Sequence, residues 1–207
     1  MKKLIQTAYV RFLLFISPIT KFIGEIYFKS SSKEHIFKRY YDIENSLLMG
    51  DVLLTHSDSH MSNLINLGYW KHAVVYVGKE NGIPMIVEAI GRGVIKRPLV
   101  EMLSSKDRIC ILRPSKKLLE IWEHKEDFVY FCKQQVGKKY DYSFDSFSKK
   151  SHESFYCSEL IYFGIITANP KADFNLRKNF GIFTVTPMDL YNMSRKEKFV
   201  KILTIKR

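Results

Sequence analysis

The chain has 207 residues, of which 46% are hydrophobic and 26% charged, so it suits one globular domain and excludes a chain that is disordered over most of its length. The 33 basic side chains outnumber the 21 acidic ones, and the net charge of +12 favours an anionic partner such as a membrane surface. Nucleic acid is not expected, because the sequence has no zinc finger, aromatic RNA-binding signature or recognition helix. Three cysteines without a CxxC pair argue against a disulfide framework and fit a reducing compartment.

Residues 1–45 form a predicted N-terminal amphipathic helical segment. Apolar residues recur at helical spacing from Ile5 to Tyr27, and Pro18 is expected to kink or break this helix. The apolar run is too short to span a bilayer, and a signal peptide is only weakly supported because a small-residue cleavage site is missing. Two interpretations stay open: the helix docks on its own domain, or it lies on an anionic membrane. The expected location is therefore cytoplasmic or membrane-associated, with export weakly supported.

Residues 46–207 are predicted to form one α+β domain. Runs rich in β-branched and apolar residues, bounded by turn residues, predict strands; these runs are GDVLLTH, HAVVYVG, MIVEAI, the stretch within GRGVIKRPL, RICILRP and KFVKILTI. Short turns join the first five, so we expect them to pair in sequence order as an antiparallel meander.

Helices are predicted between and after these strands. A short one is expected to end at Gly68, and an apolar row from Leu118 to Val136 predicts a long helix that ends at Gly137. Another should begin at or just before Cys157. Thr186 is expected to cap a last helix with Pro187 at its first position.

Cys157 is either core filler or a nucleophile. Its predicted place in the first turn of a helix puts the thiol over unpaired backbone N–H groups, which lower the thiol pKa and can hold an oxyanion. Cysteine is also a common buried residue, so the position alone does not decide. Cys132 and Cys110 have no such position, and both are expected in the core.

His72 and Glu88 supply the other two groups that a nucleophilic thiol needs. His72 opens the strand HAVVYVG, and Glu88 lies inside the next strand, where a carboxylate is unfavourable unless it is paired. Neighbouring antiparallel strands can place the two side by side. The pattern predicts an imidazole that accepts the thiol proton and an acid that orients the imidazole.

Six fragments in order resemble the circularly permuted, YiiX-like branch of the NlpC-type papain-like superfamily: GDVLLTH, WKHAVVYVG, VEAIGRGVIKRPL, GKKYDYSF, FYCSEL and VTPMDL. The resemblance covers about residues 48–192. It implies a papain-like α+β fold with packed helices on an antiparallel sheet of five to six strands, partly barrel-like, with the histidine strand before the cysteine helix. It also implies Cys157 as nucleophile, His72 as base and Glu88 as orienting residue, in a hydrolase or acyltransferase that acts on an amide, thioester or ester carbonyl.

The substrate stays open between a cell-wall peptide and an acyl or lipid molecule. Tyr140, Tyr156, His56 and His60 are candidate substrate-binding residues, although core packing explains either tyrosine equally well. His56 and His60 at spacing i, i+4 could bind zinc with His72, but the HExxH form is absent, so no metal and no cofactor are expected. The alternative function is a non-catalytic protein that holds a lipid or peptide in the same place.

Overall fold

The computed structural model describes residues 39–57, 68–119, 125–146, 152–172, 174, 177–179, 182–196 and 198–205. The expected N-terminal helix, the expected short helix before Gly68 and the candidate residue His60 lie outside these residues. Among the helices that are described, none is long and apolar enough to cross a membrane.

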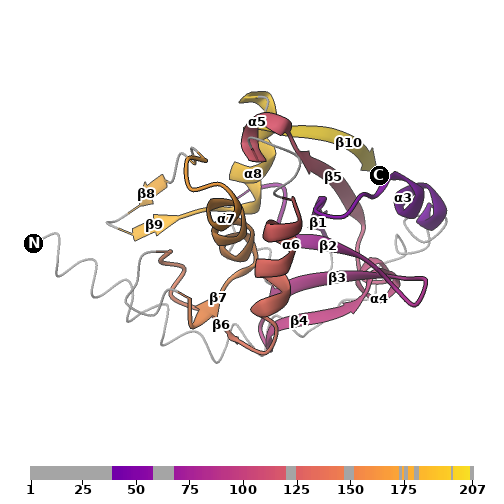
Figure 1. Ribbon diagram of the computed structural model, residues 1–207, viewed down its shortest axis with the longest axis horizontal. Coiled ribbons are helices and arrows are strands. Elements are labelled where there is room, and N and C mark those ends of the chain that lie inside the picture. The colour runs from indigo at the N-terminus through magenta and orange to yellow at the C-terminus, as the bar shows by residue number, and fades with distance from the viewer. Residues whose placement is uncertain are drawn as a thin grey trace, which may run out of the picture.

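The elements follow the predicted order in outline, with most strands before the long helices and one strand at the end (Figure 1). In chain order they are α3 (Tyr40–Ser46), β1 (Val52–His56), β2 (His72–Glu80), β3 (Ile83–Ile90), β4 (Gly93–Pro98), α4 (Leu99–Leu103), β5 (Arg108–Pro114), α5 (Lys116–Leu119), α6 (Lys125–Gln134), β6 (Lys139–Tyr140), β7 (Ser154–Phe155), α7 (Cys157–Ala168), β8 (Arg177–Asn179), β9 (Ile182–Thr184), α8 (Pro187–Met193), a 3-10 helix (Ser194–Lys196) and β10 (Phe199–Ile205).

Six strands form one antiparallel sheet in the order β10-β5-β1-β2-β3-β4, which confirms the α+β class. The expected meander holds for β1 to β4 but is wrong for β5, which pairs with β1, so that Leu54 lies opposite Cys110. The chain crosses between β4 and β5 through α4, whose Leu99, Met102 and Leu103 are buried on one face of the sheet. Among the strands that the structure describes, β10 and β4 are the edges of the sheet, so the sheet is not closed into a barrel.

The two faces of the sheet carry separate hydrophobic clusters, as the alternation along a strand requires. In β2, Val75 and Val77 pack in the cluster that includes α6, α7 and α8, whereas Val74 and Tyr76 pack in the cluster that includes α3 and α4. Figure 1 shows α6 and α7 side by side over the sheet. A side chain at the end of a strand can therefore meet groups from both layers.

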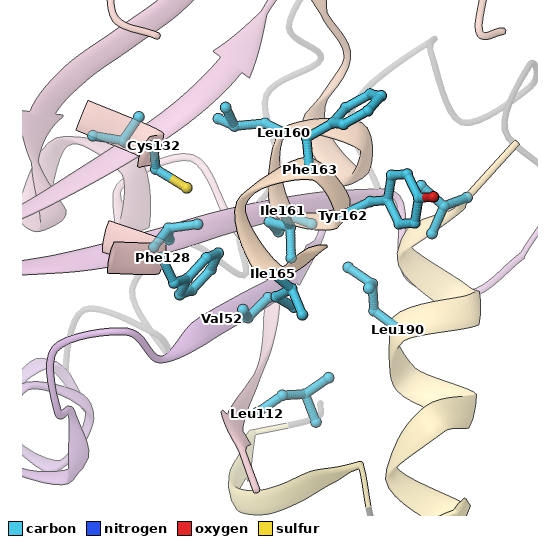
Figure 2. Close-up of a cluster of buried hydrophobic side chains, with 14 of the residues drawn as sticks. Val52, Leu112, Phe128, Cys132, Leu160, Ile161, Tyr162, Phe163, Ile165 and Leu190 are labelled. Atoms are coloured by element: carbon cyan, nitrogen blue, oxygen red, sulfur yellow. The ribbon is translucent and has the colours of Figure 1, made fainter. Parts of the chain in front are cut away.

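The α7 helix is buried on nearly every side, from Cys157 through Ile165. Figure 2 shows Phe128 and Cys132 of α6 beside it, Leu190 of α8 on another side, and sheet residues close to Ile165. Cys132 is fully buried, as expected. Val136 was expected on the buried row but is 43% exposed, because α6 ends at Gln134 and the helical period stops there.

Gly164 allows α6 and α7 to approach closely. A Cβ at this position would lie 2.7 and 2.8 Å from two ring carbons of Phe128 and 3.1 Å from the Cys132 sulfur. Phe128 is fully buried. The absence of a side chain at Gly164 therefore sets the distance between the two helices.

We predict that Gly164→Ala lowers the free energy of unfolding. Alanine gains about 1 kcal/mol in helix propensity over glycine, but an extra methyl in a filled core costs about 1–3 kcal/mol. Urea unfolding of the single variant, of Phe128→Leu and of the double variant measures this. We expect the double variant to be less destabilised than the sum of the singles, because the smaller side chain makes room for the methyl. Additive losses would contradict the close contact.

Candidate active site

Cys157 lies in the first turn of α7, where the sequence predicted it. The preceding residue, Tyr156, has an extended backbone and marks the start of the helix. The sulfur is hydrogen-bonded by the His72 imidazole and by the backbone N–H of Ala73. Cys157 is only 6% exposed, but it is in contact with polar groups and is not enclosed in hydrocarbon alone.

His72 begins β2 and joins the thiol to a carboxylate. Its Nε2 lies 2.6 Å from Oε2 of Glu88 in β3, and its hydrogen bond with Cys157 uses the remaining side of the ring. Val75 lies opposite Val87, so Glu88 lies diagonally across from His72 on the same face of the sheet. The structure therefore brings together the three residues that the sequence selected.

The charges of Cys157, His72 and Glu88 together favour a thiolate on Cys157 and an imidazolium on His72. Burial disfavours the imidazolium, but the hydrogen bonds and charges of Cys157 and Glu88 raise the pKa of His72 to about 9. Burial likewise raises the pKa of the Cys157 thiol, and the bond to His72, its positive charge and the Ala73 N–H outweigh burial and lower that pKa. The pair can carry its proton on the ring, which leaves the sulfur as a thiolate, the form of cysteine that can act as a nucleophile.

Glu88 stays ionised although its side chain is only 1% exposed. Burial alone raises the pKa of this carboxyl, but the hydrogen bond to His72 and the positive charges of His72, Arg97 and Lys106 lower it to about 2. Arg97 Nε lies 2.5 Å from Oε1 of Glu88. Neither Arg97 nor Lys106 was selected from the sequence, where the stretch IKRPL around Arg97 indicated only a strand. Counting the strand register from Glu88 would have pointed to Arg97.

The segment that follows α6 is joined to the turn between β3 and β4. Gly93 has a φ of +113°, and a Cβ there would lie 2.4 Å from the carbonyl oxygen of Lys138, so only glycine fits. Val94 N–H donates to the same carbonyl at 2.8 Å, and the Tyr142 hydroxyl donates to the Gly91 carbonyl at 3.0 Å. These contacts hold the residues around Tyr140 against the sheet.

Tyr140 lies near Cys157, and its role in substrate binding stays a prediction. It pairs with Phe155, two residues before Cys157, and is half-buried. Burial and the negative charge of the Cys157 sulfur raise the pKa of its phenol well above the usual value.

Tyr156 and His56 have other contacts. Tyr156 is buried, and its hydroxyl bonds Ser146 Oγ at 2.7 Å and accepts from Val185 N–H at 3.0 Å. Those bonds occupy the hydroxyl within the fold. His56 donates through Nδ1 to the Tyr69 carbonyl and stacks on the Tyr69 ring, with ring centres 5.1 Å apart. It ends β1, beside the strand that begins with His72.

A metal is not supported by the donors that the structure describes. Among these residues, no group of three or more His, Cys, Asp and Glu side chains is arranged to hold an ion. The ring of His72, which was the third possible ligand beside His56 and His60, faces Glu88 and Cys157 instead.

Glu159 is a second buried carboxyl near the thiol, in the first turn of α7. Its Oε2 accepts from Tyr156 N–H at 3.1 Å, whereas its Oε1 is buried without a hydrogen-bond partner. Burial and the negative charge of Asp141 raise its pKa to about 9, with smaller contributions from Asp145 and Cys157. Glu159 is therefore neutral at pH 7 and adds no negative charge beside the thiolate.

Comparison with known proteins gives one family and one similar structure. A model of permuted papain-like amidase enzymes, the YaeF/YiiX or C92 family, matches residues 46–193, a range that contains Cys157, His72 and Glu88. The crystal structure described as metalloprotein yiiX from Escherichia coli O157:H7 is similar in fold, with a TM-score of 0.63 and 19% identity over 78% of this chain and 99% of that chain. No curated protein matches the chain.

We predict that iodoacetamide alkylates Cys157 at pH 6, where an ordinary thiol with a pKa of about 8.5 is nearly unreactive. His72→Ala should slow this reaction by about tenfold or more, because loss of the imidazolium raises the thiol pKa by at least about one unit. Mass spectrometry of the modified peptides measures the rate at each cysteine. Cys110 and Cys132 are fully buried internal controls. Equal rates in the wild type and the variant would contradict the ion pair.

We predict that Glu159→Gln flattens the pH dependence of stability between about pH 5 and 9. In this range the unfolded carboxyl is ionised and the folded one is protonated. The folded state therefore binds one more proton, and the wild-type free energy of unfolding falls by up to about 1.4 kcal/mol per pH unit as pH rises. Glutamine does not titrate. Urea unfolding at pH 5.5 and pH 8 compares the two slopes, and identical slopes would show that Glu159 is ionised in the fold.

Proposed function

The chain belongs to the permuted papain-like amidase family, and on that premise we propose that it is a cysteine hydrolase that cleaves an amide bond in a peptide-type substrate. Cys157 is the nucleophile, His72 moves the proton, and Glu88 orients His72. The observation that carries the proposal is the Cys157 thiol held between a helix start and an imidazole whose Nε2 is bonded to a buried carboxylate.

The proposed reaction uses these groups in two steps. The Cys157 thiolate attacks the carbonyl carbon, and first-turn N–H groups of α7 stabilise the oxyanion. The C–N bond breaks, the His72 imidazolium donates its proton to the departing amine, and an acyl thioester remains on Cys157. Neutral His72 then accepts a proton from water as the water oxygen attacks the thioester. The acid leaves, and the thiolate and imidazolium are restored.

A non-catalytic binding protein is the alternative, and the ionisation of the site weighs against it. A binding site gains nothing from a sulfur whose pKa is lowered by a buried imidazole. The family description favours an amide over a lipid or acyl ester as the substrate. An anionic-membrane partner rests on the predicted N-terminal helix, outside the described residues, so it stays a prediction.

We predict that a peptidyl acyloxymethyl ketone, which traps a cysteine nucleophile, labels the wild-type chain once and that Cys157→Ala abolishes the labelling. Hydrolysis of a peptidyl amide by the wild-type chain should fall as pH rises through about 9, because His72 then loses the proton that the departing amine needs.

Cys132→Ala is the matched control, since it removes a buried thiol from the adjacent helix and should label at the wild-type rate. Labelling that persists in Cys157→Ala or moves to Cys110 would contradict the assignment. A competing panel of N-acyl amides, esters and thioesters measures the bond preference, and stronger protection by an acyl ester would replace the peptide by an acyl substrate.

A further inference from the structure

The side chains that contact one another in the site, Cys157, His72 and Glu88, continue to a fourth residue, Arg97. Glu88 lies on β3 between β2 and β4, and it contacts a cation on each side: His72 Nε2 at 2.6 Å through Oε2 and Arg97 Nε at 2.5 Å through Oε1. Arg97 lies opposite Ile86 in the β3–β4 register, so it is diagonal to Glu88 on the same face, as His72 is from the other side.

We propose that Arg97 is a positioning residue of the reaction. By holding one carboxylate oxygen of Glu88, it fixes the other oxygen on His72, and through His72 it maintains the Cys157 thiolate. This inference rests on the proposed function, because it needs His72 to act on Cys157. It adds a fourth residue to the site, and this residue acts through Glu88 without touching the substrate.

A carboxylate can rotate about its last side-chain bond, so a bond to one oxygen alone does not fix the other. Arginine is suited to this task because its guanidinium is planar and presents its donors in fixed directions. The contact is enclosed, with side-chain exposures of 23% for Arg97 and 1% for Glu88, so solvent screens it less than a surface pair. The geometry therefore gives Arg97 a directional role as well as a charge.

The positive charges that lower the pKa of Glu88 come from His72 of β2, Arg97 of β4 and Lys106, which precedes β5. Lys106 also interacts electrostatically with Asp107 and with the Cys157 sulfur. Lys106 contributes positive charge to the carboxylate, whereas Arg97 is hydrogen-bonded to it. Replacing Arg97 by a neutral residue removes both a hydrogen bond and a positive charge from Glu88, whereas Arg97→Lys removes the planar guanidinium and keeps the charge, so the two variants separate orientation from charge.

The same sheet supplies a matched control. Arg113 in β5 bonds the fully buried Asp51 at 2.8 Å through both Nε and Nη2, and Arg113 is 21% exposed. Asp51 precedes β1, whereas His72 lies opposite Thr55 near the other end of that strand, about 13 Å away by strand rise. Arg97 and Arg113 are thus similar in burial and in bonding a carboxylate, but the described contacts of Asp51 include no histidine.

The experiment measures the rate of iodoacetamide alkylation at Cys157 against pH in the full chain, for wild type, Arg97→Gln and Arg113→Gln. We expect Arg97→Gln to raise the thiol pKa by half a unit or more, which lowers the alkylation rate at pH 6 by about threefold or more. Arg113→Gln should lower the free energy of unfolding and leave the thiol pKa at the wild-type value. Arg97→Lys keeps the positive charge but loses the planar guanidinium, and it should raise the thiol pKa by a smaller amount.

The outcomes separate this inference from the proposed function. A wild-type thiol with an ordinary pKa that His72→Ala does not change would overturn the proposed function itself. A lowered wild-type pKa that Arg97→Gln leaves unchanged would overturn only the role of Arg97. A pKa that falls further in Arg97→Gln would also overturn it, because Arg97 would then oppose the thiolate instead of maintaining it. If Arg97→Gln does not fold, Arg97→Lys decides by the same criterion.

Discussion

The constraint on which the structure depends is the burial of an ionised carboxylate between three strands. An isolated buried charge is strongly unfavourable, so Glu88 requires cations in fixed places. His72 and Arg97 meet this requirement from β2 and β4, and they can do so only in the observed register, since a slip of one residue would turn either side chain to the other face. The register that pairs Glu88 with its cations is therefore also the register that assembles the site. Asp51 shows the contrast: burial raises its pKa despite its bonds to Arg113, because fewer cations compensate it.

The nucleophile and its partners come from opposite faces of the sheet, and the fold has to bring them together at the strand ends. α7 packs on the face that carries Val75 and Val87, whereas His72 and Glu88 project with the other face. They meet because α7 begins where β2 begins, with Ala73 N–H directed at the sulfur. Two glycines contribute to this arrangement. Gly164 lets α6 lie against α7, and Gly93 lets the segment that contains Tyr140 lie against β4. Small residues far from the sulfur therefore help to fix its position.

The sequence predicted the features that depend on residues close together in the chain. β-branched runs marked the strands, Thr186 and Pro187 marked the start of α8, and the six fragments identified a family that the comparisons confirm. It could not place β5, because the pairing of β5 with β1, in which Cys110 lies opposite Leu54, joins segments that are far apart in the sequence. Nor could it predict the direction of the Tyr156 hydroxyl, which depends on Ser146 and Val185, 10 and 29 residues away. Arg97 was accessible in principle, but only after the β3–β4 register was known.

Proton counting shows that Cys157, His72 and Glu88 together add little pH dependence to the stability of the fold near neutral pH. The raised pKa of His72 contributes stability that is complete below its unfolded value of 6.5 and is lost as pH rises through about 9. The lowered pKa of Cys157 acts in the opposite sense: its contribution is complete above the ordinary thiol value of about 8.5 and is lost as pH falls. Between pH 6.5 and about 8.5 the folded pair holds one proton on the His72 ring, and the unfolded pair holds one proton on the Cys157 sulfur. The two states then bind the same number of protons, so the opposite effects of the two residues on the free energy of unfolding cancel. Glu88, with its pKa lowered to about 2, contributes fully above its ordinary value of 4.5 and loses its contribution only in acid. The three residues can thus maintain a reactive thiolate across neutral pH while their combined effect on stability stays constant there.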